Sequence, residues 1–209
     1  MRQKLDQRLR CPDCRMHLEL CVCHLSPRLD LKTRVEVVIH YADIRKMSNS
    51  GRLVKLALQN SAVHVRGLKD KPVEAAPDKK YETDLVLFPG HGSVELNEKF
   101  LSPAAHPLRL LIPDGSWNQA SSMVKREPLM KNAVKVHLPA GIQAKYRIRA
   151  QEDPFKLCTF EAVIRALGVI EGSRAEEKLD AFFRVWIYRS LYIKGRIAKA
   201  DMPEGILMA

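Results

Sequence analysis

The chain has 209 residues, 46% of them hydrophobic, which is enough for one main domain with a substantial core and a small appendage. No apolar run reaches the roughly 18 residues of a membrane span, and the first residues lack the apolar centre of a signal peptide, so we expect a soluble, cytoplasmic protein without a membrane partner. The 35 Lys and Arg outnumber the 24 Asp and Glu, and the net charge of +11 favours a polyanionic partner, with a nucleic acid as the first candidate.

The first element in chain order is a cluster of cysteines within residues 1–30. Its pattern, Cys-x2-Cys-x6-Cys-x-Cys, supplies the four thiolates that a closed tetrahedral zinc site needs. In a cytosolic chain such a cluster favours metal binding over disulfides. We therefore expect a small module pinned by a structural zinc, because four protein ligands leave no open position for chemistry. The predicted ligands are Cys11, Cys14, Cys21 and Cys23.

From residue 31 onward, short apolar runs alternate with amphipathic segments. The predicted strands are 35–40, 61–67, 84–90, 108–115 and 134–139. The predicted helices are 49–60, 117–130, 157–170 and a long amphipathic C-terminal helix with a basic flank that includes Arg184, Arg189 and Lys194. This alternation predicts an α/β fold with a mostly parallel sheet and helices on both faces.

Polar residues gather where the first predicted strand ends. His40 closes the strand, where a polar lining role is conceivable. Residues 48–52 read Ser-Asn-Ser-Gly-Arg, which can cap a helix or offer backbone N–H groups to an anion. Taken alone, this segment favours the simpler interpretation of a helix cap.

The predicted strand 108–115 runs into Pro113, Asp114, Gly115, Ser116 and Trp117. We expect proline to stop the strand and glycine to allow a turn. As local structure, the serine caps the next helix and the tryptophan staples the core. As a functional site, an aspartate at the carboxyl end of a central strand can take a proton from a substrate, and an indole can shape a pocket for a base. Local sequence leaves both interpretations open.

The last segment with distinctive chemistry precedes the helix 157–170. Tyr-Arg-Ile-Arg at 146–149 can meet a phosphate or a carboxylate. Cys158 and Thr159 stand at the helix start, and Glu161 favours the helix dipole. Cys158 is not interpreted as a nucleophile, because no neighbouring residue supplies a base.

Together these segments resemble the DTW-domain family (TDD superfamily), the tRNA-uridine aminocarboxypropyltransferases, in its bacterial type. The resemblance rests on CPDC with CVC, on IHYADIR leading to SNSGR, on LLIPDGSWNQA as an Asp-x-Thr/Ser-Trp signature, and on YRIR followed by CTFEA. These motifs span residues 11–162 in the order of the family. Ser116 and Ser50 replace commoner threonines, and Cys158 stands where the family often has serine.

The resemblance implies an α/β fold similar to the SPOUT class, with a trefoil knot. It implies S-adenosylmethionine as donor of a 3-amino-3-carboxypropyl group to the imino nitrogen of a tRNA uridine, in bacterial members the variable-loop uridine, with release of 5′-methylthioadenosine. The expected organisation is a zinc module at 1–30 and a catalytic domain at 31–209 that ends in the basic helix. We expect a monomer that acts on tRNA.

On this resemblance, Asp114 is the candidate base, and Ser116 and Trp117 shape the catalytic pocket. The residues expected to hold the donor are Leu87, Pro89, Leu111, Ile112, Pro113, Gly115, Cys158, Thr159 and Glu161. The residues expected to hold the RNA are His40, Arg45, Ser48, Asn49, Ser50, Arg52, Arg147 and Arg149.

Two other functions stay open at this stage. One is a SPOUT-like RNA methyltransferase that uses the same donor. The other is a non-catalytic zinc module that binds RNA, for which the basic N-terminus and C-terminal helix would suffice. The three functions differ in their product on a tRNA uridine: an aminocarboxypropyl adduct, a methyl adduct, or none.

Overall fold

The computed structural model describes residues 9–68, 73, 81, 83–101, 107–141, 144 and 157–207. These residues form a six-stranded sheet in the order β2-β1-β5-β3-β6-β4, and every neighbouring pair is parallel. The strands are β1 (Arg34–His40), β2 (Ser61–Arg66), β3 (Thr83–Leu87), β4 (Val94–Glu95), β5 (Leu108–Asp114) and β6 (Val134–His137). The predicted α/β class with a mostly parallel sheet is confirmed.

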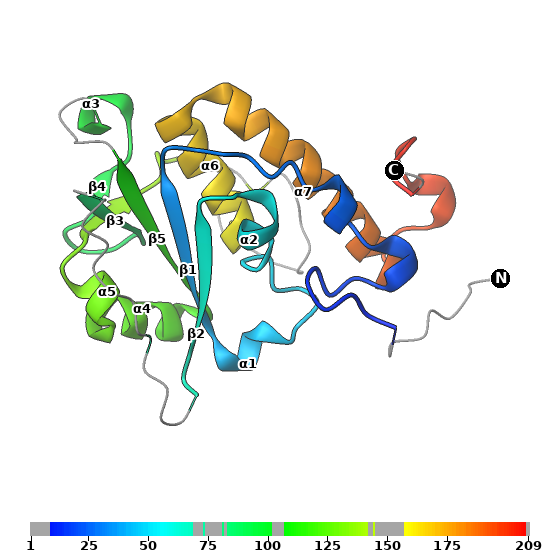
Figure 1. Ribbon diagram of the computed structural model, residues 1–209, viewed down its shortest axis with the longest axis horizontal. Helices are drawn as coiled ribbons and strands as arrows, with labels where there is room; N and C mark the ends of the chain where they lie inside the picture. The colour runs from blue at the N-terminus through cyan, green and yellow to red at the C-terminus, as the bar shows by residue number, and fades with distance from the viewer. Residues whose placement is uncertain are drawn as a thin grey trace.

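Helices lie on both sides of this sheet (Figure 1). One side carries α2 (Leu53–Ala57), α6 (Thr159–Glu171) and α7 (Ser173–Ile193), and the other carries α4 (Trp117–Arg126) and α5 (Pro128–Lys131). The short helices α1 (Tyr41–Ile44) and α3 (Glu98–Leu101) belong to connections between the larger elements. No helix in the described ranges is long and apolar enough to cross a membrane.

Strand alternation divides the buried side chains into two cores. Val37 and Ile39 of β1 face the core under α6 and α7, whereas Val38 faces the core under α4 and α5. Successive side chains of a strand point to opposite faces, so a strand covered on both sides is apolar throughout. This explains why β1 and β5 appear in the sequence as largely hydrophobic runs, interrupted within each strand only by Glu36 and by Arg109 and Pro113.

Two predicted helices are shorter than their sequence patterns indicate. The helix predicted at 117–130 is interrupted at Glu127, which adopts φ −74° and ψ 125° before Pro128. Proline disfavours helical geometry in the residue that precedes it, so α4 ends there and α5 begins anew. The helix predicted at 49–60 covers only Leu53–Ala57, because residues 48–52 form a loop at the candidate site.

The prediction that Pro113 stops the strand is wrong. β5 continues through Asp114, with Pro113 in register with Val38 and Asp114 in register with Ile39 of β1. On its other side β5 pairs with β3 only as far as Leu111. A proline lacks the backbone N–H, so it fits a strand where one side has no partner. Asp114 is thereby held in extended geometry at the carboxyl end of a central strand.

The cysteine-rich N-terminal segment packs against α7. Met16 and Val22 belong to the same core as Trp186. The guanidinium of Arg189 is buried and donates hydrogen bonds to the carbonyls of Cys21 (2.8 Å) and Ile206 (2.8 Å). The amphipathic character of α7 is confirmed. Arg189, which was predicted in its basic flank, is instead buried and joins the cysteine-rich segment to the segment that contains Ile206.

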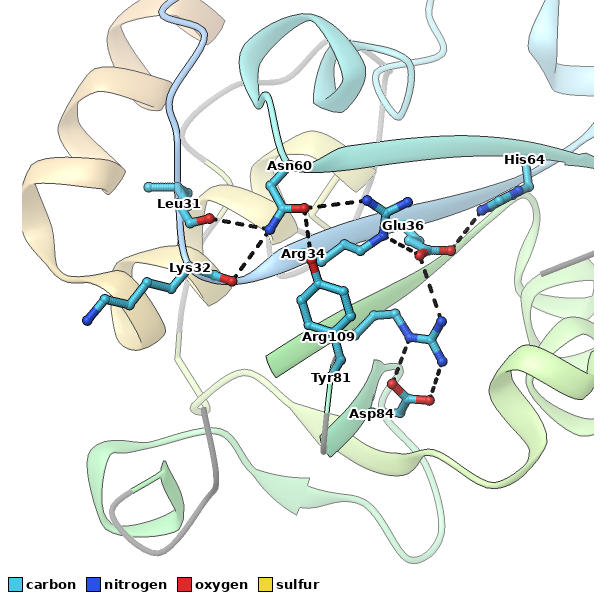
Figure 2. Close-up of polar contacts among 9 residues, drawn as sticks. All are labelled: Leu31, Lys32, Arg34, Glu36, Asn60, His64, Tyr81, Asp84 and Arg109. Atoms are coloured by element: carbon cyan, nitrogen blue, oxygen red, sulfur yellow. Dashed lines mark hydrogen bonds and ion pairs between the residues drawn. The ribbon is translucent and has the colours of Figure 1, made fainter. Parts of the chain in front are cut away.

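A polar network, buried at Glu36 and Arg109 and partly exposed at its other members, crosses the sheet at the end opposite Asp114. Figure 2 shows the carboxylate of Glu36 between Arg34 (2.6 Å), His64 (2.8 Å) and Arg109 (3.8 Å). Arg109 also makes a bidentate pair with Asp84, with N–O distances of 2.7 and 2.5 Å. Burial would raise the pKa of Glu36, but the hydrogen bonds from His64 and Arg34 and their charges lower it to about 2. These ion pairs and hydrogen bonds join neighbouring strands at the end of the sheet opposite Asp114.

Replacement of this carboxylate should destabilise the protein in a pH-dependent way. Because the pKa of Glu36 is lowered to about 2 on folding, its stabilisation is present above pH ~4.5 and is lost as the pH falls towards 2. We expect Glu36→Gln to reduce the free energy of unfolding by about 3 kcal/mol at neutral pH, and the difference from wild type to shrink below pH ~4.5. Urea unfolding at several pH values measures this, with the exposed Glu177→Gln as control. A pH-independent difference would contradict the assignment.

Candidate functional site

The candidate site is built around the carboxylate of Asp114 at the end of β5. This side chain is 93% buried, with an exposed fraction of 7%. The side-chain amide of Asn49 donates to its Oδ2 at 2.5 Å, and the hydroxyl of Thr159 donates to its Oδ1 at 2.6 Å. Two segments distant in the sequence, the loop 48–52 and the start of α6, therefore meet at one carboxylate.

The loop 48–52 is held in place by the side chain of Arg52. Its guanidinium donates to three backbone carbonyls of the preceding segment, those of Ile44, Lys46 (3.2 Å) and Asn49 (3.3 Å). Burial and the neighbouring charge of Arg15 lower the pKa of Arg52 to about 10, which leaves it protonated at neutral pH. Arg52 thus fixes the loop that presents Asn49 to Asp114.

The start of α6 is joined to the same loop. Cys158 is the N-cap residue and makes no side-chain capping bond, but the backbone N–H of Phe160 donates to Oγ of Ser50 at 3.2 Å. A serine from another segment therefore satisfies one of the free N–H groups of the helix. Burial raises the pKa of Cys158 to about 11, so its thiol is neutral at neutral pH. Glu161 is fully buried one turn on, with Oε1 3.8 Å from Nη2 of Arg165.

Ser116 and Trp117 lie at the start of α4. Ser116 is the N-cap, and with Gln119 it forms a capping box. Trp117 has an exposed fraction of 55%, so it does not staple the core. Its ring instead lies beside that of Phe88, with centroids 5.5 Å apart. Phe88 directly follows β3, so the aromatic pair occupies the same carboxyl edge of the sheet as Asp114.

The four N-terminal cysteines converge on one point. Their Sγ atoms all lie within 4.8 Å of one another, with Cys11 and Cys23 at 3.6 Å and Cys14 and Cys21 at 3.7 Å. A tetrahedral zinc with Zn–S bonds of about 2.3 Å requires sulfur separations of about 3.8 Å. None of the four cysteines forms a disulfide. Burial raises the pKa of Cys14 to about 11, and a bound cation would offset that cost. The geometry therefore suits a tetrahedral metal ion.

The profile of the DTW domain matches residues 8–191. The chain belongs to the DTW domain family. The matched range includes the cysteine cluster, both loops at Asp114 and most of α7, so the family's domain extends over almost all of the structure described above.

Curated relatives of this DTW chain are tRNA-uridine aminocarboxypropyltransferases. Those named tRNA-uridine aminocarboxypropyltransferase 2 from Macaca fascicularis and Mus musculus are 26% and 25% identical, and each alignment covers 79% of this chain. The chain spans only 57% and 58% of those two proteins. tRNA-uridine aminocarboxypropyltransferase A of Arabidopsis thaliana is 29% identical over 88% of this chain and 82% of its own length. No solved structure has a significant match to the chain.

The remaining predicted residues of the DTW chain fall into three groups. Leu87, Leu111 and Ile112 are buried in the cores, so only their backbone atoms can reach a ligand, whereas Pro113 and Gly115 are partly exposed beside Asp114. His40 caps α1, because its side chain accepts a hydrogen bond from the backbone N–H of Ala42. Ser48 is partly exposed, whereas Arg45 and Pro89 are exposed. Arg147 and Arg149 lie outside the described residues.

Sequence reasoning missed two residues that shape this site. Phe88 follows a predicted strand, but nothing in the sequence places it beside Trp117. Gly51 was predicted only as part of a segment that caps a helix or offers backbone N–H groups to an anion. A methyl group at Gly51 would overlap Oδ2 of Asp114 and lie 3.1 Å from its Cγ and 3.2 Å from Cγ1 of Val37. The glycine itself is the only sequence signal for such a close approach.

The close approach at Gly51 gives a testable prediction. We expect Gly51→Ala to cost about 1–3 kcal/mol of stability, because the carboxylate of Asp114 cannot shift without breaking its bonds to Asn49 or Thr159. Thermal unfolding of Gly51→Ala, Asp114→Ala and the double variant forms a cycle. Gly51→Ala should reduce the melting temperature less in the Asp114→Ala background than in the wild-type protein. Additive effects would show that the methyl group does not meet Asp114.

Proposed function

We propose that this DTW protein transfers the 3-amino-3-carboxypropyl group of S-adenosylmethionine to the imino nitrogen of a tRNA uridine. The observation that carries the proposal is the site itself. In a chain of this family, a carboxylate at the end of a central parallel strand is held by the loop 48–52 and by the start of α6, at an edge where such sheets bind ligands. The names of the relatives point to this reaction, and the net charge of +11 suits a tRNA.

The proposed chemistry needs one base and close alignment. Asp114 takes the proton from the uracil imino nitrogen, which then attacks the methylene carbon of the amino acid chain that is bonded to sulfur. The new N–C bond forms as the C–S bond breaks. The electron pair of the C–S bond goes to the sulfonium, which leaves as the neutral thioether 5′-methylthioadenosine. Positioning provides the rest of the acceleration, because the sulfonium is already a good leaving group.

The binding roles follow the two segments at Asp114. We propose that S-adenosylmethionine binds at the start of α6, where it contacts Cys158, Thr159 and Glu161. It also contacts the carboxyl ends of β3 and β5, where Leu87, Leu111 and Ile112 contribute backbone atoms. We assign the RNA to the side of the loop 48–52, with His40 and the exposed Arg45, and to Arg147 and Arg149. Asn49, Ser50 and Arg52 act as positioning residues in this arrangement, because their polar groups already hold the site together.

The finer features of the family complete the proposal. Cys11, Cys14, Cys21 and Cys23 would hold a structural zinc, which stabilises the fold of a module at 1–30 beside the catalytic domain at 31–209. The family also leads us to propose a SPOUT-like topology with a trefoil knot, a variable-loop uridine as the target, and a cytoplasmic monomer. The basic residues of α7 that remain exposed, such as Arg184, extend the surface for tRNA.

A double-label experiment tests the proposed reaction. The protein is incubated with unmodified tRNA and S-adenosylmethionine that carries ³H on the methyl group and ¹⁴C in the amino acid chain. We expect only ¹⁴C to enter the tRNA and ³H to leave in 5′-methylthioadenosine. Transfer of ³H to tRNA would make the protein a methyltransferase. If neither label enters the tRNA while the tRNA still binds, the protein is an RNA-binding module.

A further inference from the structure

Two exposed aromatic side chains flank Asp114 at the carboxyl edge of the sheet. Trp117 is 55% exposed and is backed by Phe88 at the end of β3. Tyr41 is 49% exposed and directly follows β1, with its ring centroid 4.8 Å from that of His40. Since β1 and β3 are the two neighbours of β5, these pairs lie on opposite sides of the strand that ends in Asp114.

Both exposed rings are supported from one side. A methyl group added at Gly67 after β2 would lie 2.9 Å from Cδ1 of Tyr41, so the tyrosine ring rests against the glycine backbone. Trp117 contacts the ring of Phe88 at an interplanar angle of 57°. An exposed aromatic ring that is held in place can stack on another flat, apolar surface. On a basic protein, the partner that offers such surfaces is expected to be anionic. Unpaired nucleobases of a nucleic acid meet both conditions.

We propose that Trp117 with Phe88, and Tyr41 with His40, form two stacking platforms for the unpaired bases on either side of the modified uridine. Neighbouring parallel strands are about 4.8 Å apart, so the ends of β1 and β3 are about 10 Å apart across β5. A base directed between them at Asp114 must leave its own stack, and the two platforms replace the stacking that its neighbours lose. This inference rests on the proposed function, because it takes the substrate to be single-stranded RNA.

The test uses fluorescence-labelled decauridylate and an abasic strand with the same number of phosphates. We expect the wild-type protein to bind decauridylate at least about 5- to 150-fold more tightly than the abasic strand, the range expected for a single stacked base. Tyr41→Ala and Trp117→Ala should each reduce this ratio, and Tyr41→Phe should keep it within about twofold. The control is Val134→Ala, which removes an apolar side chain of 43% exposure from the amino end of β6.

Tryptophan fluorescence provides an independent readout. The chain has two tryptophans, and Trp186 is fully buried, so quenching by added RNA reports on Trp117. Decauridylate should quench the signal and the abasic strand should not. Equal binding of both strands by the wild-type protein would overturn the inference. It would also be overturned if S-adenosylmethionine alone quenched the fluorescence and Trp117→Ala bound this donor more weakly, because Trp117 would then belong to the donor site. Neither measurement requires turnover, so a failure of the proposed reaction would be seen separately in the double-label assay.

Discussion

Replacement of Asp114 by asparagine should reduce kcat for uridine modification by about 10²- to 10⁴-fold, the contribution expected of a positioned general base. Asparagine has nearly the same shape, and its side-chain oxygen can still accept one of the two hydrogen bonds from Asn49 and Thr159. It cannot take a proton at neutral pH. Single-turnover kinetics with saturating tRNA and S-adenosylmethionine measure the effect on the chemical step.

The alternative is that Asp114 only joins the loop 48–52 to the start of α6. In that case Thr159→Val, which removes one of its hydrogen bonds, should reduce kcat as much as Asp114→Asn does. If Asp114 is the base, Thr159→Val should reduce kcat far less at saturating S-adenosylmethionine, and any loss of donor binding should appear in KM instead. Asp43→Asn is the matched control, because it removes a carboxylate from α1 that pairs with Lys46 near the same edge of the sheet. Full activity of Asp114→Asn would eliminate the proposed base.

The second large effect is expected from the double variant Cys11→Ser, Cys14→Ser. Structural zinc contributes about 10–16 kcal/mol of apparent binding free energy in small zinc modules, which is comparable to the whole stability of a domain. The damage should spread beyond the module, because Met16 and Val22 share a core with α7 and Arg189 would lose a fixed acceptor at Cys21. We expect loss of bound metal and a marked fall in melting temperature.

Metal analysis by plasma mass spectrometry and thermal unfolding check this prediction together. Cys158→Ser is the control, since this cysteine lies at the start of α6 and outside the cluster, and it should keep the full metal content. A double variant that retains one zinc per chain would refute the ligand assignment. Loss of zinc without any change in melting temperature would instead refute the structural role of the ion.

The sequence predicted the strands well because each is a short apolar run with clear boundaries. β1, β2, β3, β5 and β6 all lie at predicted places, and their parallel arrangement follows from the helices between them. Helix lengths were predicted less well, since a 3.6-residue pattern continues across Glu127 although Pro128 divides the helix. The continuation of β5 through Pro113 depends on the absence of a β3 partner at that level, which is a property of the sheet and not of the local sequence.

For the site, the sequence located the segments but not their contacts. Residues 48–52 and 158–161 were both predicted to lie near Asp114, yet the hydrogen bonds from Asn49 and Thr159 join residues 65 and 45 positions away from it. Local patterns carry no information about such pairings. The exposure of Trp117 and its contact with Phe88 were equally hidden, because an indole after a strand can face the core or the solvent.

The most direct test of the proposed reaction is a crystal structure of the protein with S-adenosylmethionine and a uridine-containing RNA. The account predicts that the methylene carbon of the amino acid chain, bonded to sulfur, faces both the uracil imino nitrogen and the carboxylate of Asp114. A donor whose methyl group points at that nitrogen, or a uridine bound away from Asp114, would contradict it.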